Sequence, residues 1–372
     1  MDKRILYLGG FELPDKNAAA QRVISNGKLL REMGFEVTFV GISKDINNAP
    51  IIVDGFSNYP ISYPKNSIQW IRQITNFISS DKLLDYQPNF VVLYNFPAIA
   101  SLKILRLCHK HGIKVIHDLT EWEQTEGFSP RDIIKRADTA LRMRYCMKRM
   151  DGVIAISRFL YNIYKDSVKT ILVPPTVDLS SPKWNRERQL TALKLGDKIK
   201  IIFAGSAGPL KDRLDLVIDA LHGFENIVLN IVGTTQQQFE QRFGYSPILN
   251  DNIKFMGLKN HLEAIKMVAD SDFQVIIRTE SLKTRAGFPT KYVESMSCCV
   301  PVIATKTSNI EDYLKNGVNG FIVEESQPLR KVFDIISNLQ SDDIKKMKQN
   351  CKNFEGFDYH SYLLEFSKIF KA

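Results

Sequence analysis

Short runs of β-branched and aromatic residues alternate with helical segments along this chain, and the alternation occurs twice. In the first half, residues 4–8 predict a strand and residues 18–33 predict a helix. Gly34 is suited to close that helix in a left-handed conformation, and residues 36–41 predict the next strand. The strand runs are short, mostly apolar and β-branched, and they alternate with helices, so they predict parallel sheets covered by helices on both faces, an α/β fold.

The remaining predicted elements follow the same alternation. The first half continues with strands at residues 90–94, 114–117 and 153–156, a helix that ends at 111–112 and a helix at 158–165. The second half has strands at 200–203, 227–232, 253–255, 273–277 and 302–304, and helices at 212–221, 261–269 and 290–297. Each half therefore contains the elements of a doubly wound sheet.

The length and the prolines predict two domains. A chain of 372 residues accommodates two domains at roughly 150 residues each. Pro174, Pro175 and Pro182 lie between the halves and prevent a continuing helix or strand. We expect Rossmann-like domains over residues 1–175 and 176–355 that face each other across a cleft, where ligands would bind beyond the carboxyl ends of the strands.

Residues 356–372 form the last predicted segment, an amphipathic helix. Its aromatic residues are at positions 357, 359, 362, 366 and 370. Two arrangements fit this pattern: the helix packs back on the N-terminal domain, or it faces the core of its own domain.

The cysteines and the hydropathy predict a cytoplasmic protein without a membrane-spanning segment. The five cysteines are scattered and show no zinc-binding spacing, which is typical of a reducing compartment. A first strand at residue 4 leaves no room for a signal peptide. The longest apolar stretch, residues 90–102, is interrupted by Asn95 and Pro97 and is too short to cross a bilayer.

Residues 287–323 contain the most informative polar pattern. Glu294 lies early in a predicted helix, where its carboxylate can accept two hydrogen bonds from a vicinal diol such as a ribose. Backbone N–H groups around residues 288–291, at the start of the helix, are suited to an anion. A glutamate that only stabilises a solvated first turn fits the same spacing.

This stretch resembles the glycosyltransferase family 4 group, whose members share the two-domain fold called GT-B. Its matching residues are Gly287-Phe288, Glu294-Ser295-Met296, Pro301-Val302-Ile303-Ala304, Glu311 and Asn319-Gly320. Matching segments elsewhere, in the family's order, are His117-Asp118, Ile156-Ser157, Pro175-Thr176-Val177-Asp178 and residues 201–211. The resemblance implies a GT-B fold and a transferase that takes sugar from a nucleotide-diphosphate sugar with retention of anomeric configuration.

The resemblance also implies which residues bind the donor. Glu294 and Lys211 would be catalytic groups, because an ammonium at Lys211 stabilises the charge that develops on the leaving diphosphate without a metal. The other implied donor-side residues are Gly10, Gly205, Ser206, Arg213, Gly287, Phe288, Pro289, Thr290 and Lys291. We expect no essential metal and no cofactor apart from the nucleotide sugar as co-substrate.

Two positions depart from the family pattern. Ala286 stands where the family usually has the first Glu of its E-x7-E pair, so recognition of the donor sugar is expected to differ; Arg285 and Lys291 flank this position. Ser206 stands where a phosphate-binding Arg normally follows Gly205, and Arg213 is a candidate replacement. These losses leave two other hypotheses open: a subunit that binds a nucleotide sugar without turnover, and a sugar-nucleotide epimerase of the same fold.

The first domain is expected to bind the acceptor, a glycan or a polyprenyl-diphosphate-linked glycan used in surface polysaccharide synthesis (capsule, exopolysaccharide or O-antigen). His117 is predicted to end a buried strand and to face the cleft as a catalytic group. The predicted acceptor-side residues are Gly9, Asp118, Glu121 and Trp122. A structural histidine and a buried anchor tryptophan fit the same residues. The G-x-G-x-x-G and P-loop motifs of other nucleotide-binding enzymes are missing from the sequence.

The net charge of +9 predicts an anionic partner. Residues 131–150 contain seven basic residues and two acidic ones, and residues 59–78 combine aromatics, isoleucines and two cations. Together these segments predict contact with an anionic membrane, as in a peripheral protein on the inner face of the plasma membrane. A solvated helix face beside a core-facing helix fits them equally. No nucleic-acid-binding signature accompanies the charge, so we expect no nucleic acid partner.

Overall fold

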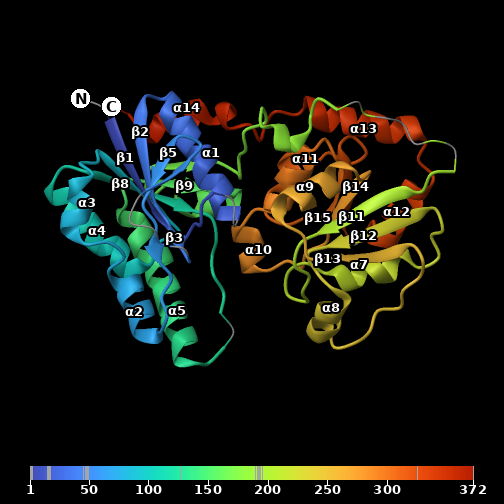
Figure 1. Ribbon diagram of the computed structural model, residues 1–372, viewed down its shortest axis with the longest axis horizontal. Helices are drawn as coiled ribbons and strands as arrows, with labels where there is room; N and C mark the ends of the chain where they lie inside the picture. The colour runs from blue at the N-terminus through green and yellow to red at the C-terminus, as the bar shows by residue number, and fades with distance from the viewer. Residues whose placement is uncertain are drawn as a thin grey trace. The chain divides into compact units, whose positions relative to one another are not determined.

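The computed structural model describes residues 3–14, 18–44, 46, 50–125, 127–188, 190, 194, 196–324 and 326–371. By its contacts the chain divides into two compact units. Unit 1 comprises Met1–Val177, Arg285–Phe288 and Tyr359–Ala372, and unit 2 comprises Asp178–Thr284 and Pro289–Asp358. Each unit has a central sheet with helices packed around it (Figure 1).

The sheet of unit 1 is almost entirely parallel, as the sequence predicts. Among the described residues its strand order is β10-β9-β8-β7-β1-β2-β5-β4, and only β4 and β5 pair antiparallel. The strands are β1 (Lys3–Gly9), β2 (Phe35–Val40), β4 (Ile51–Val53), β5 (Phe56–Asn58), β7 (Phe90–Tyr94), β8 (Lys114–Leu119), β9 (Gly152–Ala155) and β10 (Thr170–Leu172). A separate short pair consists of β3 (Ile42–Ser43) and β6 (Ile61–Ser62).

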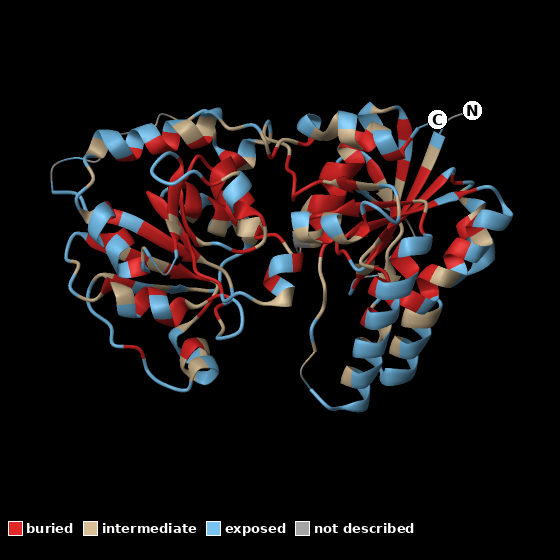
Figure 2. Ribbon diagram, turned by 180° about the vertical axis from the view of Figure 1, so that it is seen from behind, coloured by how far each residue is buried: buried red, intermediate tan, exposed pale blue. Residues whose placement is uncertain are grey.

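The helices of unit 1 cover this sheet with their apolar faces. They are α1 (Ala18–Glu32), α2 (Ser67–Thr75), α3 (Ser80–Asp85), α4 (Ala98–Lys110), α5 (Pro130–Leu141), α6 (Arg158–Tyr164) and α14 (Leu363–Ile369). A π-helical turn at Arg142–Cys146 and a 3-10 turn at Met147–Arg149 follow α5. Figure 2 shows buried residues concentrated on the strands and exposed ones on the outer faces of the helices.

The C-terminal segment packs on unit 1, but the prediction of one helix over residues 356–372 is wrong. A 3-10 turn at Tyr359–Tyr362 precedes the shorter α14. Phe370 lies against Phe35 and Phe90, with ring centroids 6.2 and 5.3 Å away. Because α14 places Phe366, Ile369 and Phe370 in the core of unit 1, its aromatic residues are packing residues.

Unit 2 has a parallel sheet of order β13-β12-β11-β14-β15-β16 in the described part of the chain. Its strands are β11 (Ile199–Ala204), β12 (Ile227–Val232), β13 (Ile253–Gly257), β14 (Phe273–Ile276), β15 (Val302–Thr305) and β16 (Gly320–Val323). Its helices are α7 (Leu214–Leu221), α8 (Gln236–Phe243), α9 (His261–Ala269), α11 (Thr290–Ser297), α12 (Leu329–Ser337) and α13 (Ser341–Asn353). The short helix α10 (Leu282–Ala286) begins in unit 2 and ends in the part of the chain that belongs to unit 1.

Each sheet has a point at which the strand order reverses. In unit 2 the chain leaves β11 toward β12 on one side, and β14 later pairs with the other side of β11. In unit 1 the same reversal separates β1 from β7. Loops that follow the strands at such a point leave a crevice, which is where ligands bind in doubly wound sheets. Ligands are therefore expected at the loops after β11 and β14 in unit 2 and after β1 and β7 in unit 1.

Two general properties of the chain bear on the predictions. Within the described residues, no helix is both long enough and apolar enough to cross a membrane. The five cysteines are free thiols and all are buried.

Candidate functional site

The loop after β11 in unit 2 is shaped around a lysine. Gly205 has a φ of +129°, a backbone conformation that favours glycine. A Cβ atom on Gly205 would collide with the end of the Lys291 side chain, which comes from the first turn of α11. Thr234 fixes the same loop, because its hydroxyl donates to the Gly205 carbonyl at 2.9 Å and accepts from the Ala207 N–H at 2.9 Å. The loop and the start of α11 thus converge on the Lys291 ammonium.

Asp212 joins the loop after β11 to the end of β14. Its Oδ2 accepts from Lys291 Nζ at 2.8 Å, and its Oδ1 accepts from Arg278 Nε at 2.8 Å. Burial raises the pKa of Asp212, but the two cations outweigh burial and hold that pKa at about 2. Asp212 is therefore ionised and pairs with both cations, Lys291 and Arg278.

The cations at this place outnumber the carboxylate. Lys211 lies next to Asp212 in sequence, and partial desolvation together with the charge of Arg278 lowers the pKa of Lys211. Burial also lowers the pKa of Lys291, against the attraction of Asp212. Burial is the main cause of both lowered pKa values, and the charge of Arg278 adds to it; an anionic ligand would favour the charged form of both lysines.

Arg242 of α8 also reaches the loop after β11. Its Nη1 donates to Ser206 Oγ at 2.6 Å and to the Ala207 carbonyl at 2.8 Å. The suggestion that Arg213 replaces the missing family arginine is not supported, because Arg213 makes a bidentate ion pair with Asp215 at 2.9 and 2.5 Å. The cation that touches Ser206 is therefore supplied by α8.

Glu294 lies on α11, one turn after Lys291. Its Oε1 is 3.1 Å from His261 Nε2, and the two side chains are 18% and 31% exposed. The partial exposure keeps Glu294 accessible, and His261 holds its orientation. Its predicted role toward a ribose stays a prediction, as do the roles of Lys211 and Thr290.

The predicted segment 285–290 changes unit at Pro289. Arg285–Phe288 belongs to unit 1, where Ser157 Oγ donates to the Ala286 carbonyl at 2.6 Å and the Arg285 guanidinium lies 5.3 Å from the Phe159 ring centroid. Phe288 is buried in the structure. Arg285 is therefore stacked on an aromatic ring of unit 1. Gly287 and Phe288 also belong to unit 1, whereas Pro289, Thr290 and Lys291 belong to unit 2.

His117 of unit 1 is fully buried and lies within β8, not at the end of a strand as predicted. Its Nε2 accepts a hydrogen bond from the Phe96 N–H at 3.2 Å, and burial and Arg142 lower its pKa to about 3. An acceptor at Nε2 requires the proton on Nδ1 in the neutral ring. His117 is thus a neutral residue of the packed core, which agrees with a structural histidine and not with a catalytic group.

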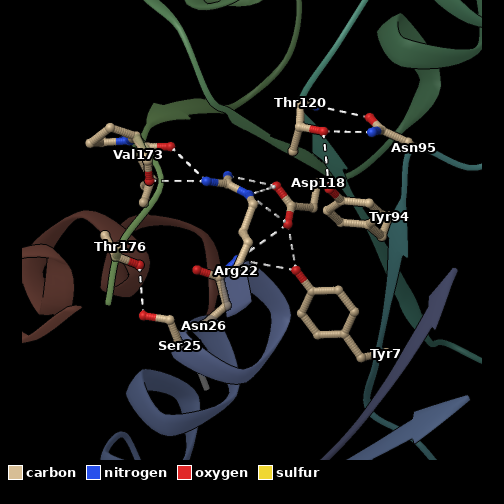
Figure 3. A network of polar contacts seen from close by, with 11 residues as sticks. Tyr7, Arg22, Ser25, Asn26, Tyr94, Asn95, Asp118, Thr120, Val173 and Thr176 are labelled. Atoms are coloured by element: carbon tan, nitrogen blue, oxygen red, sulfur yellow. Dashed lines mark hydrogen bonds and ion pairs between the residues drawn. The ribbon is translucent and has the colours of Figure 1, made fainter. Parts of the chain in front are cut away.

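Asp118 is the centre of a buried polar network and not an acceptor ligand (Figure 3). It accepts from Arg22 Nη2 at 2.7 Å, from the Tyr7 hydroxyl at 2.6 Å and from Asn26 Nδ2 at 3.2 Å. Arg22 also donates to the carbonyls of Val173 and Pro174 at 3.1 and 3.0 Å. The aspartate is fully buried, and these contacts connect β1, α1, β8 and the segment after β10.

The other predicted residues of unit 1 differ in accessibility. Gly9 is buried where a Cβ would meet Tyr94 Cβ at 2.7 Å, so strand packing requires this glycine. Gly10 is exposed and has nothing within 4 Å of an added Cβ. Glu121 and Trp122 are half-buried, and the Trp122 ring lies 6.4 Å from that of Phe159. Gly10, Glu121 and Trp122 remain available to a ligand.

Asp270 and Asp272 have the D-x-D spacing of a metal-binding motif, but they lie at the opposite end of the sheet. Asp272 precedes β14, pairs with Lys348 Nζ at 2.6 Å and accepts from the Lys200 N–H at 2.9 Å. Over the whole described part of the chain, no group of three His, Cys, Asp or Glu side chains is arranged to hold a metal ion.

The residues around the loop after β11 lie within a segment that matches a known family. Residues 185–354 match the model of the glycosyl transferases group 1. The match contains Gly205, Lys211, Lys291 and Glu294, and also the three residues that the sequence analysis missed: Asp212, Arg242 and Arg278.

Curated relatives and solved structures are similar to a longer part of the chain. Two uncharacterized glycosyltransferases of Methanocaldococcus jannaschii are 24% and 23% identical to it over 60% and 61% of its length. The matched parts span 59% and 61% of those relatives.

Solved structures show that the fold is shared with glycosyltransferases of the GT-B type. A glycosyltransferase from Rickettsia africae has a TM-score of 0.68 at 15% identity, covering 100% of this chain and 99% of its own. A sucrose-phosphate synthase from Thermosynechococcus elongatus has a TM-score of 0.67 at 13% identity, covering 99% and 98%. Anabaena HepE in complex with UDP-glucose has a TM-score of 0.65 at 16% identity, covering 98% of each chain.

Proposed function

We propose that this protein is a retaining glycosyltransferase that moves a hexose from a nucleotide-diphosphate sugar to a glycan or polyprenyl-diphosphate-linked acceptor in surface polysaccharide synthesis. The observation that carries the proposal is the surplus of positive charge at the carboxyl ends of β11 and β14. Lys211, Lys291 and Arg278 surround one carboxylate there, and Arg242 lies against the adjoining loop.

The chemistry of the donor suits this surplus. As the bond between the anomeric carbon and the diphosphate breaks, its electron pair stays on the diphosphate oxygen and adds negative charge. Fixed cations aimed at that oxygen stabilise the transition state more than the ground state. Lys291 and Lys211 are compact charges suited to phosphate oxygens, and no metal is required for this role. We infer that the proton of the acceptor hydroxyl passes to the leaving phosphate.

Glu294 is the proposed ribose ligand. It lies on the same helix as Lys291, at a spacing of three residues, so the two side chains project from neighbouring turns of one face. A carboxylate one turn beyond a phosphate-binding lysine is placed for the ribose of the same nucleotide. The Anabaena neighbour binds UDP-glucose, which supports a nucleotide sugar as the ligand class.

A binding subunit without turnover is the second candidate. It is favoured by one observation: Ala286 is fully buried and offers only its carbonyl, which Ser157 already occupies. The residue that touches the donor sugar in similar enzymes thus has no counterpart at this position.

Nucleotide release separates the two candidates. The purified protein would be incubated with UDP-, GDP- and dTDP-sugars and a membrane-extracted acceptor, with Lys211→Ala, Glu294→Ala and the exposed control Lys331→Ala in parallel. A transferase releases nucleotide with wild-type and control protein, and each site variant loses about 10²-fold or more. Donor binding without release would favour the binding subunit, and release unchanged in both site variants would refute the site.

A further inference from the structure

A pocket in unit 2 lies beyond the ends of β14, β15 and β16, between α7 and α12. Its volume is about 670 Å³, within the range of sites that hold a small organic molecule. Ile277, Val323 and Leu329 line it and are buried members of the core of unit 2. Leu216 of α7 completes the apolar wall and is 42% exposed. Of the residues that surround Asp212, Arg278 also lines this pocket.

Arg278 supplies the pocket with a buried cation. The residue follows β14, and Thr305 holds its backbone: the Arg278 N–H donates to Thr305 Oγ1 at 2.9 Å, and that hydroxyl donates to the Arg278 carbonyl at 3.0 Å. The Arg278 side chain is only 7% exposed. In the ranges that the structure describes, this side chain donates one hydrogen bond, from Nε to Asp212. Its terminal nitrogens, Nη1 and Nη2, therefore keep their donors for a ligand, because burial without a partner is costly.

The other two cations that line the pocket are already engaged. Lys306 Nζ lies 3.3 Å from a carboxylate oxygen of Glu324, which also lines the pocket. Arg330 Nη1 donates to two backbone carbonyls at the end of α7, at 3.4 and 2.8 Å. With Glu280 as the remaining charged residue, the lining carries three positive and two negative charges. The pocket therefore has a surplus of one positive charge, and the donors that remain for a ligand are those of Arg278.

We propose that this pocket binds a small organic carboxylate with an apolar body. The terminal nitrogens of Arg278 hold the carboxylate, since a guanidinium matches the two oxygens of that group. The apolar walls cover the rest of the ligand and remove it from water. A surplus of one positive charge suits a monoanion better than the dianion of a phosphate monoester, because Glu280 and Glu324 repel the second charge.

The pocket shares Arg278 with the cluster around Asp212, so a ligand in one place should affect the other. The two carboxylate oxygens of Asp212 hold Arg278 and Lys291. A carboxylate on Arg278 reduces the positive charge that the cluster presents to a nucleotide diphosphate. The ligand should therefore weaken nucleotide binding, and the nucleotide should weaken binding of the ligand by the same factor. This regulation rests on the proposed function, whereas binding in the pocket does not.

Calorimetry with the full chain and octanoate tests the pocket, because octanoate combines one carboxylate with an apolar body. Three further probes each change one property: octanol lacks the charge, acetate lacks the apolar body, and octyl phosphate carries a larger charge. Octanoate is expected to bind the wild type about tenfold or more tightly than each of them, since a hydrogen bond to a charged group and several buried methylene groups contribute.

Two variants change the pocket in different ways. Arg278→Met removes the guanidinium and should weaken octanoate binding about tenfold or more. Leu216→Asp places a negative charge in the exposed wall, outside the cluster around Asp212, and should weaken octanoate binding by about the same factor. The matched control is Ile335→Asp on α12, which adds the same charge at a residue of similar exposure, 41%, outside the pocket lining. It should bind octanoate as the wild type does, and Leu216→Asp keeps the test available if Arg278→Met does not fold.

The pocket assignment would be overturned by no octanoate binding to the wild type, by equal binding of octanoate and octanol, or by equal losses in Leu216→Asp and Ile335→Asp. Tighter binding of octyl phosphate than of octanoate would overturn the choice of a carboxylate. UDP titrated in the presence of saturating octanoate should bind about fivefold more weakly than without it. An unchanged affinity for UDP would overturn the regulation, whereas a wild type that binds octanoate and no UDP would support the pocket and refute the proposed function.

Discussion

Each unit contains a buried aspartate paired with an arginine, but the two aspartates have different surroundings. In unit 1, one arginine, one tyrosine and one asparagine donate to Asp118, and the remaining arginine donors reach backbone carbonyls. In unit 2, Asp212 is shared by Lys291 and Arg278, and Lys211 stands beside it. The first cluster is balanced in charge, whereas the second has more cations than acids.

The exposed fractions of the side chains also differ between the two clusters. The side chains of Arg22 and Asp118 are 2% and 0% exposed, whereas that of Lys291 is 19% exposed beside an Asp212 at 7%. A balanced and closed cluster stabilises a fold, because breaking it leaves a buried charge. A cluster with surplus charge and an accessible cation is completed by a ligand. A paired acidic residue is therefore not evidence of a site by itself; the balance of charge around it is.

The largest expected effect comes from breaking the closed cluster. Arg22→Met leaves the Asp118 carboxylate buried without its cation, so the free energy of unfolding should fall by about 3–5 kcal/mol. Urea denaturation measures this loss. Arg22→Met combined with Asp118→Leu removes both charges and should recover part of the stability, and a double variant no more stable than the single one would contradict the comparison.

The second effect is the response of unit 1 to acid. Because the pKa of His117 is about 3 in the fold and about 6.5 unfolded, protonation favours the unfolded chain. The stability that neutral His117 contributes is fully present above about pH 6.5. It is lost as the pH decreases, so the free energy of unfolding should be lower by roughly 3 kcal/mol near pH 4. Urea midpoints measured across this range should show the fall. His117→Asn keeps an acceptor for the Phe96 N–H without the titrating ring, so its midpoints should change less, and an identical pH profile would contradict this role.

Much of the fold follows from the sequence because its central strands, such as β1, β7 and β14, are apolar runs that are buried on both faces. The strands at 90–94 and 227–232 and the helices at 261–269 and 290–297 were predicted with the bounds that the structure has. The short outer elements β4, β5 and α3 carry no comparable pattern and were not predicted. Register and strand order come from long-range packing, which local periodicity does not contain.

The same dependence on long-range packing explains which site residues can be identified from the sequence and which cannot. Gly205 and Lys291 were identified through the resemblance, and the contact between them depends on α11 lying beside the loop after β11. Arg278 was missed because its relevance comes from β14 pairing with β11. Asp118 was misread because its partner Arg22 is 96 residues away and buried with it. A cation directly after a strand at the reversal point is a signal that could have found Arg278.

The third effect tests, through catalysis, the cluster around Asp212 in unit 2, which is the open cluster because Lys291 is accessible. Lys291→Met keeps the apolar stem but removes the ammonium, so nucleotide release should fall about 10²-fold or more, equivalent to about 2.7 kcal/mol of transition-state stabilisation. The control Lys283→Met removes a nearby exposed cation and should lose less than tenfold. Steady-state nucleotide release measures both. Equal losses in the two variants would mean that only the general field of unit 2 matters and that the Lys291 position does not.

The smallest effect is expected in only one of the two clusters. Asp212→Asn removes the carboxylate that pairs with both Lys291 and Arg278 and competes with a ligand for them, so calorimetry should show nucleoside diphosphate binding about five- to tenfold tighter. Asp118→Asn in unit 1 should leave that affinity unchanged while it lowers stability. Asp215→Asn, which frees only Arg213, is the matched control within unit 2. Weaker binding by Asp212→Asn would show that Asp212 acts mainly by holding the two cations in place, and the open cluster would then depend on its aspartate as the closed one does.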